Sequence, residues 1–480
     1  MIRCWGALLA PALALALLLA PARAQDAKPA DLLQEAEREA TRGNYTKARR
    51  IYAQVAERFP GTEESLVAAR RAGKNAFLRA VPLWESGPSD RRIDITILGD
   101  GFVMDDQPKF DKWARATVEI LFKVDALKRY QHFCNLRAMN ILSAEDGVDS
   151  ADEKRLYDTA LDAKSLGGGG QVYIDTGKVM EMLAEVREAD DLAIVLVQRG
   201  VLGTGGGGIA TTGRPDRSTI VHEWGHAFGG LLDEYNFGSA DRERGFGTRG
   251  YNISDTSDPK QVPWAHFLEK RVKGVGVVEG GAGIAKGRWR PTPAGCAMGA
   301  AGSLGGYCPV CRERMIHCIY MRCGAIDEAA PADPVVRVRP GKEALFRVKP
   351  MRVEGPPELD SKWLLYRVKD DEEVLYPKSE EATNLADVFL LPGTVAPATR
   401  SRTPLPEARG DERKGSRASD GFLELRIADL AEGTYEVQCW VEDRTPWVLV
   451  DERQLLKDAR RWILEVGPLV EDHPTTAPPR

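Results

Sequence analysis

The chain has 480 residues, of which 66 are basic and 71 acidic, so its formal net charge is −5. This length is enough for about three domains, and a hydrophobic content of 43% allows each of them an ordinary core. The near balance of charges gives no sign of the basic surface that binds nucleic acid or an anionic membrane. The sequence therefore indicates a globular multidomain protein, whose partners must be inferred from its motifs.

Residues 1–24 have the organisation of a secretory signal peptide. Arg3 precedes an apolar run over residues 5–20, and Ala22 and Ala24 form a small-residue cleavage pattern. The apolar run is short for a membrane-spanning helix, which favours cleavage over retention as an anchor. We therefore expect a secreted or periplasmic protein with no transmembrane segment in its mature chain.

The first predicted domain, residues 25–88, is a helical hairpin. The spacing of Gly43, Tyr52 and Pro60 resembles one tetratricopeptide repeat, and the helical pattern continues to about residue 80. A single repeat cannot bury its own faces, because stable arrays need about three repeats. We therefore expect the hairpin to dock on the next domain rather than to form a peptide-binding array.

Alternating strand and helix patterns follow, over a second predicted domain at residues 89–328. Residues 93–98 alternate between apolar and polar, and residues 192–197 form a continuous apolar run that is typical of a buried central strand. Between them the pattern predicts a helix over about 108–130, a strand near 136–142 and a helix near 176–188. This alternation predicts an α/β catalytic core.

The turn after the buried strand contains Gly203, Gly205 and Gly208, which formally match G-x-G-x-x-G. No helix pattern opens at these glycines and no P-loop lysine follows, so the nucleotide-binding interpretation lacks its context. We expect instead a turn that leads into a strand along the cleft, because an exposed edge there can accept an extended peptide.

Residues 222–226 read His-Glu-Trp-Gly-His, the H-E-x-x-H pattern of zinc hydrolases. On a helix, His222 and His226 lie one turn apart on the same side, where both imidazoles can reach one ion with Glu223 beside them. Apolar residues occupy the opposite side and can pack on a core. A paired glycine, Gly229 and Gly230, offers a place to end the helix.

The third ligand of a catalytic zinc site is missing from this five-residue motif, since such a site usually has three protein ligands and one water. Ten residues after the first histidine the chain has Leu232, which cannot bind zinc. Asp233 and Glu234 come next. On a continued helix Asp233 would lie about 10 Å along the axis beyond His226, so the chain must bend at the glycines for Asp233 to bind. Glu234 is the alternative ligand.

Five of the seven cysteines that follow the signal peptide lie between Cys296 and Cys323. Outside the cytoplasm such a cluster is more often held by disulfides than by a metal. Cys308 and Cys311, with Cys318 and Cys323, imitate a four-thiolate zinc site, but the gap between the pairs is short for a zinc ribbon. We therefore expect disulfides here.

The third predicted domain, residues 331–468, is an immunoglobulin-like β-sandwich. Short β-like runs lie at 335–338, 344–348, 363–368, 388–391, 422–427, 435–441, 447–450 and 462–466. Tyr435 resembles the tyrosine of a tyrosine corner, although Val437 stands where an immunoglobulin domain has its second cysteine. No candidate site residue lies in this domain, which is consistent with an accessory module that has its own core; the competing hypothesis is that the sandwich completes the catalytic core. Residues 469–480 are expected to be a disordered tail.

Several segments together resemble the IgA-peptidase family of secreted zinc metallopeptidases. They occur in the expected order between about residues 91 and 325, and are more specific than the zinc motif alone. The carrying segments are residues 97–102, 143–149, 222–235, 258–264, 290–298 and 308–311.

The resemblance implies a zincin or metzincin-like catalytic domain. It makes His222 and His226 zinc ligands, Asp233 the third ligand and Glu223 the catalytic residue. It also makes Met298 a candidate for the methionine turn beneath the metal, the alternative being an ordinary core methionine. The family name does not establish that immunoglobulin is the substrate.

The expected function is hydrolysis of a peptide bond within an extended protein or peptide substrate, by zinc-activated water with Glu223 as general base. Tyr235 or Tyr251 can stabilise the oxyanion, although a tyrosine packed under the site is the more frequent case. Two other classes stay open. One is a secreted binding protein with an inactive or structural zinc site, and the other is a zinc amidase or esterase that acts on non-peptide substrates.

Overall fold

The computed structural model describes residues 28–150, 155–165, 170–186, 192–199, 202–239, 250–293, 295–299, 306–369 and 408–468. The chain divides into two compact units, Met1–Arg79 and Ala80–Arg480. The predicted signal peptide, the predicted strand at 388–391 and the predicted tail lie outside the described residues. Within the described ranges, no helix has both the length and the apolar character needed to cross a bilayer.

The first unit contains three helices, α1 (Pro29–Thr41), α2 (Tyr45–Arg58) and α3 (Glu63–Ala72). Small side chains such as Ala40 and Ala48 form much of their shared core, which lets the helices approach closely. The prediction of helix to about residue 80 is wrong. Gly73 follows the last turn of α3, and buried Phe77 begins a strand instead, β1 (Ala76–Trp84).

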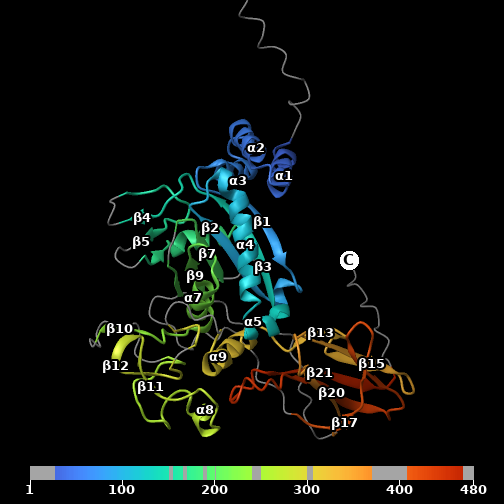
Figure 1. Ribbon diagram of the computed structural model, residues 1–480. Coiled ribbons are helices and arrows are strands. Elements are labelled where there is room, and N and C mark those ends of the chain that lie inside the picture. The colour runs from blue at the N-terminus through green and yellow to red at the C-terminus, as the bar shows by residue number, and fades with distance from the viewer. Residues whose placement is uncertain are drawn as a thin grey trace, which may run out of the picture. The chain divides into compact units, whose positions relative to one another are not determined.

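A six-stranded sheet forms the centre of the second unit, in the order β1-β3-β2-β7-β9-β8 (Figure 1). Its further strands are β2 (Ile93–Asp100), β3 (Cys134–Leu142), β7 (Ala193–Val197), β8 (Thr204–Gly206) and β9 (Ile209–Thr212). The strands predicted near 93–98, 136–142 and 192–197 are confirmed. Strands β3, β2, β7 and β9 are parallel neighbours, whereas β8 pairs antiparallel with β9 at the edge of the sheet.

Two helices, α4 (Gln107–Leu121) and α7 (Arg217–Gly229), pack against this sheet and against each other. The predicted helix over 108–130 is divided, because the chain is extended at Val124, whose side chain enters the core, before α5 (Asp125–Arg129) begins. In Figure 1, α4 lies in front of the sheet and α7 lies beside β9. The packing against β8 and β9 holds α7 at the sheet edge.

The remaining elements of the second unit before the C-terminal sheets are short. Its 3₁₀ turns are Ser89–Arg91, Met104–Asp106 and Gln131–Phe133. Its other helices are α6 (Thr176–Leu183), α8 (Ala265–Glu269) and α9 (Pro309–Tyr320). One small sheet contains β4 (Asp149–Ser150), β5 (Lys164–Ser165) and β6 (Val172–Tyr173), and another contains β10 (Asn236–Ser239), β12 (Gly283–Arg290) and β11 (Val278–Gly281).

Two packed sheets make up the C-terminal region. One has the order β13 (Ile326–Ala330), β15 (Ala344–Pro350), β19 (Leu423–Ile427), β18 (Ser416–Arg417). The other has the order β14 (Val335–Val338), β21 (Lys457–Val466), β20 (Gly433–Glu442), β16 (Asp360–Arg367), β17 (Asp411–Arg413). Phe346 of the first sheet packs on Trp462 of the second, with ring centroids 5.1 Å apart. The Tyr435 hydroxyl donates to the Ala431 carbonyl at 3.0 Å, as a tyrosine corner requires.

The predicted strand at residues 447–450 is wrong. This apolar run forms a loop whose backbone is satisfied by a side chain, because the N–H of Leu449 donates to the Glu313 carboxylate on α9 at 2.6 Å. The guanidinium of Arg312, also on α9, lies 4.6 Å from the centroid of the Trp447 ring. The run is therefore apolar because it packs on α9, not because it belongs to a sheet.

A buried polar network joins the two C-terminal sheets to the α/β region before them. Arg129 of α5 forms an ion pair with Asp443, which follows β20, at 3.1 Å, and the exposed fractions of the two side chains are 4% and 0%. The hydroxyls of Tyr130 and Tyr320 donate to the same carboxylate, at 2.6 and 2.9 Å. Both regions also contribute to one hydrophobic core. The C-terminal sheets and the α/β region are therefore expected to unfold together.

Replacing Asp443 by Ala should destabilise the protein by about 3–5 kcal/mol, because it leaves the Arg129 charge buried without its partner. The exposed pair of Glu343 with Arg426 offers a control, and Glu343→Ala should leave stability unchanged within error. Urea unfolding of both variants, followed by tryptophan fluorescence, measures the difference. If Asp443→Ala had the stability of Glu343→Ala, the buried network would not hold the two regions together.

Candidate metal centre

Helix α7 carries the H-E-x-x-H motif and has a defined start and end. Asp216 caps its first turn, since its carboxylate accepts from the N–H of Thr219 at 3.0 Å. The helix stops at Gly230, which has a left-handed φ of 61°, a conformation that glycine adopts without strain. The chain then turns back toward the helix, where the N–H of Leu231 donates to the Gly225 carbonyl at 3.1 Å.

This turn brings Asp233 to the two histidines. Its Oδ1 atom lies 3.0 Å from Nε2 of His222 and 3.1 Å from Nε2 of His226. The two Nε2 atoms are themselves 3.1 Å apart. The bend that the sequence requires for Asp233 is therefore present, and the three atoms converge on one point.

Backbone carbonyls determine which nitrogen of each histidine faces that point. Nδ1 of His222 lies 2.7 Å from the Ala297 carbonyl oxygen, and Nδ1 of His226 lies 2.6 Å from that of Leu231. A carbonyl oxygen only accepts, so both Nδ1 atoms carry protons and both neutral rings turn an Nε2 lone pair toward the other. Two such lone pairs at 3.1 Å need a cation or a proton between them.

The donor set fits a metal ion with an open coordination position. In a tetrahedral zinc site with bonds of about 2.0–2.1 Å, the ligand atoms lie about 3.3–3.4 Å apart, close to the spacing found here. The side chains of His222, His226 and Asp233 remain 14%, 16% and 11% exposed, so solvent reaches this face. Two imidazoles and a carboxylate with access for water are the usual protein ligands of a catalytic zinc ion.

The carboxylates at the site have opposite pKa shifts. Burial alone would raise the pKa of Asp233, but its close contacts with His222 and His226 hold it well below its usual range, so this group is an anion. Burial raises the pKa of Glu223, against the attraction of the same histidines. In the described part of the chain, no group donates a hydrogen bond to the Glu223 carboxylate, which leaves it available to a proton.

Met298 lies beneath α7 and is fully buried. A Cβ atom at Gly225 would collide with the Met298 sulfur, so the glycine of the motif permits this contact. The carbonyl of Met298 accepts from the N–H of Glu234 at 2.6 Å, and the neighbouring Ala297 carbonyl orients His222. The structure therefore places Met298 directly under the candidate metal ligands.

The glycine-rich turn belongs to the edge strand β8 and lies against α7. A Cβ atom at Gly203 would collide with the side chain of Glu223, and one at Gly205 would collide with the Glu223 carbonyl oxygen. Gly206 has no neighbour within 4 Å of the position that its Cβ would take. The glycines at 203 and 205 therefore permit the close approach of an edge strand to the site.

Of the two candidate tyrosines, only Tyr235 lies at the site. Its ring stacks on His222 with centroids 5.8 Å apart, and burial together with the nearby Asp233 raises the pKa of its hydroxyl. Tyr251 instead donates to Glu313 at 3.0 Å. Tyr235 is therefore a neutral hydrogen-bond donor beside the metal ligands.

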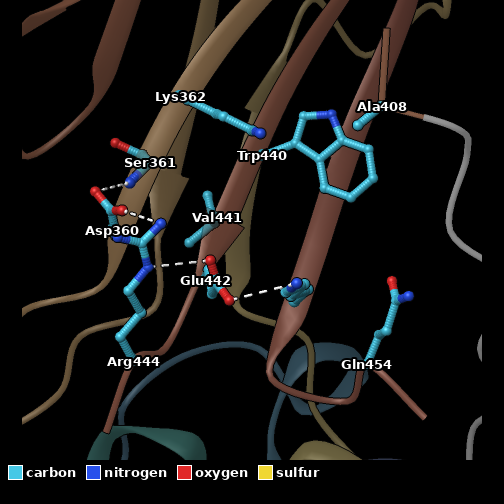
Figure 2. A pocket seen from close by; sticks show the side chains of 10 residues that line it. Asp360, Ser361, Lys362, Ala408, Trp440, Val441, Glu442, Arg444 and Gln454 are labelled. Atoms are coloured by element: carbon cyan, nitrogen blue, oxygen red, sulfur yellow. Dashed lines mark hydrogen bonds and ion pairs between the residues drawn. The ribbon is translucent and has the colours of Figure 1, made fainter. Parts of the chain in front are cut away.

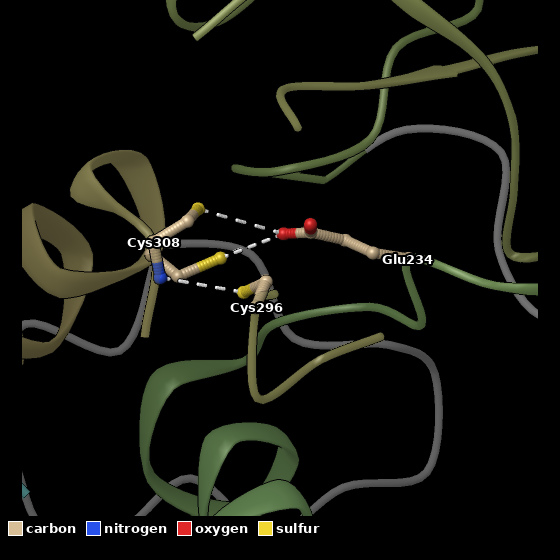
Figure 3. A group of neighbouring side chains, drawn as sticks. Glu234, Cys296 and Cys308 are labelled. Carbon is tan, nitrogen blue, oxygen red and sulfur yellow. Dashed lines mark hydrogen bonds between the residues drawn. The ribbon is translucent and has the colours of Figure 1, made fainter. Parts of the chain in front are cut away.

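Glu234, the alternative third ligand, points to a different group of side chains. Its Oε1 atom lies 2.9 Å from the sulfur of Cys311 and 3.8 Å from that of Cys308 (Figure 3). Burial raises the pKa of Glu234 to about 8. The disulfide prediction is wrong for this structure, in which all seven described cysteines are free thiols. Sequence spacing missed this cluster because Glu234 is 74 residues away from Cys308 in the chain.

A hollow of about 400 Å³ lies on the sandwich and contains none of the candidate site residues (Figure 2). Several of its charges are already paired, since Arg444 contacts Asp360 at 2.9 Å and Glu442 at 3.1 Å. Trp440 in its wall is buried and offers no open ring for a ligand to stack on. The size of this hollow is therefore no evidence of function.

Comparisons with known proteins bear on the segment that holds the site. Among solved structures, domain 1 of VCBP3 from Branchiostoma floridae aligns with 15% identity over 29% of this chain and 93% of its own, but its TM-score of 0.16 carries no structural argument. A comparison with curated proteins gives no match. Residues 81–273 match the family model described as IgA Peptidase M64, and this segment includes α7 and Asp233. The match confirms, over residues 81–273, the resemblance seen in the sequence.

Proposed function

We propose that this protein is a secreted or periplasmic zinc-dependent metalloendopeptidase. The observation that carries the proposal is the convergence of His222, His226 and Asp233 within 3.1 Å of one another, in a segment that matches a peptidase family. Glu223 stands beside them with a carboxylate that no described side chain engages. The proposed export depends on the signal-like sequence of residues 1–24.

Each residue has a part in the proposed reaction. Zinc, when bound, lowers the pKa of a coordinated water towards about 7 and polarises the scissile carbonyl. Glu223 accepts the proton of the attacking water and delivers it to the departing amine, and its raised pKa favours this exchange. The Tyr235 ring stacks on the His222 ring, and the Tyr235 hydroxyl lies beside Asp233. No covalent intermediate with the enzyme is required.

The edge strand β8 supports an extended peptide as substrate. Among the described residues, β8 is the last strand of its sheet and pairs there only with β9, while the Thr204 hydroxyl donates to the Val172 carbonyl at 2.8 Å. The edge near Gly205 and Gly206 is the part that we propose for main-chain pairing with a substrate. Strand β8 also contacts α7 directly, which supports binding of a peptide alongside the proposed metal ligands. Together with Met298 beneath α7, this arrangement favours a metzincin-like site.

The two other classes have less support. A binding protein with a structural metal site has no use for an uncommitted Glu223 carboxylate beside a solvent-accessible metal face. A non-peptide amidase or esterase does not need the edge strand. Neither class agrees with the peptidase family match.

Replacing Glu223 by Gln should lower kcat/KM for a peptide substrate by about 10²–10⁴-fold, because the amide cannot accept the proton of the attacking water. Bound metal should stay at the wild-type level, since the three ligands are unchanged. Glu119→Gln on the exposed side of α4 is the control and should retain full activity. Wild-type turnover by the Glu223 variant would show that another group is the base.

Replacing Asp233 by Ala should remove one equivalent of metal relative to the wild-type protein and abolish peptide cleavage, because two histidines alone leave the site one ligand short. Elemental analysis after dialysis measures the metal. Asp255→Ala, at an exposed carboxyl group, is the control. Unchanged metal content in the Asp233 variant would argue that the histidines bind the ion with another third ligand.

Replacing Gly205 by Ala should lower kcat/KM by at least about tenfold, because the new methyl group meets the backbone of α7 and must displace β8 from the site. Gly206→Ala, one residue further along, meets open space and should have wild-type kinetics. Equal kinetics of the two variants would exclude a function for the close approach of β8.

A further inference from the structure

The geometry points to a second metal site in this protein, a structural zinc site formed by Cys296, Cys308, Cys311 and Glu234. The three sulfur atoms and one carboxylate oxygen all lie within 4.8 Å of one another. Figure 3 shows the Glu234 carboxylate directed at the thiols. This site is separate from the candidate catalytic ligands and does not depend on the proposed peptidase function.

The four side chains come from three parts of the chain. Glu234 lies in the turn that follows α7, Cys296 in the loop that precedes Met298, and Cys308 and Cys311 at the start of α9. The N–H of Cys308 donates to the Cys296 sulfur at 3.4 Å. These segments bring four potential ligand atoms together, and no disulfide joins the three cysteines. Small structural zinc sites are built in the same way.

Burial is the second argument. The exposed fractions of Glu234, Cys296, Cys308 and Cys311 are 4%, 1%, 7% and 0%. Among the described residues, no Lys, Arg or His contacts the Glu234 carboxylate. A buried carboxylate without a cation is costly, whereas a divalent ion bound by all four groups supplies the missing positive charge.

The surroundings of Glu234 orient it as a ligand. Asn252 donates to Oε1 at 3.1 Å and Thr292 donates to Oε2 at 3.2 Å. Such neighbours fix the direction of a metal-binding carboxylate. On the opposite side, Cys308 precedes the first turn of the 12-residue helix α9, whose N-terminal dipole favours thiolates.

The ligand types select the ion. Three thiolates favour a soft or borderline cation, and a fully buried set of four with no open position is typical of structural zinc rather than of a catalytic ion. Each thiol loses its proton to solvent as zinc binds. A disulfide would use only two of the three sulfurs and would leave the third thiol and the Glu234 carboxylate without a partner of opposite charge.

Metal content tests the proposal. The full-length chain purified in the presence of zinc should hold two zinc ions, and Cys311→Ser should hold one. Cys318→Ser is the matched control, because Cys318 is also buried on α9 but lies outside the cluster, and this variant should hold two. Equal zinc content in the wild-type protein and in Cys311→Ser would overturn the second site.

Cobalt replacement keeps the test decisive if Cys311→Ser fails to fold. Co²⁺ bound at the cluster should give an intense sulfur-to-cobalt charge-transfer band in the near ultraviolet, which the ligands His222, His226 and Asp233 cannot produce. His222→Ala should retain this band while it loses the catalytic ion. Absence of the band from the cobalt-loaded wild-type protein, or a disulfide among Cys296, Cys308 and Cys311 in non-reducing mass spectrometry, would contradict the proposal. Loss of catalysis in Glu223→Gln would affect neither result.

Discussion

The left-handed turn at Gly230 is the constraint on which the site depends. A helix that continued past Gly229 would carry Asp233 away from His226 along its axis, and the two histidines would have no third partner. Because glycine adopts the positive φ without strain, the chain reverses there and Asp233 reaches both Nε2 atoms. The same reversal brings the Leu231 carbonyl to Nδ1 of His226. One turn therefore supplies the candidate ligand Asp233 and also orients the candidate ligand His226.

The same turn connects two groups of side chains with opposite character. Asp233 and Glu234 are consecutive in a non-helical segment, where neighbouring side chains point to opposite sides. Asp233 faces a partly exposed set of imidazoles with room for water, whereas Glu234 faces a dry cluster of thiols. A metal ion in that cluster would fix the backbone beside Asp233, the candidate third ligand of the other site. The hydrogen bond from the N–H of Glu234 to the Met298 carbonyl already links this segment to the residue beneath α7.

The sandwich is coupled to the catalytic region through desolvated contacts. The Asp443 carboxylate contacts Arg129 of α5, Tyr130 directly after α5, and Tyr320 of α9. Because α9 also carries Cys308 and Cys311 and packs on α7, disturbance of the sandwich reaches the site through one helix. These contacts therefore argue against a sandwich that folds as an independent accessory domain. No candidate site residue lies in the sandwich.

Local patterns in the sequence determined much of this picture. The spacing of His222 and His226, the glycine pair after them and the alternation of strands and helices all act over a few residues, so they predicted α7, its end and the central strands. Tertiary structure decided the rest. Asp233 and Glu234 are equivalent in sequence, and only the turn assigns them to different sites. Spacing paired Cys308 with Cys318 and Cys323, whereas packing brought it to Cys296 and Glu234. The apolar run at 447–450 resembled a strand because apolar residues mark burial of any kind, and not only burial in a sheet. This run packs on α9 instead.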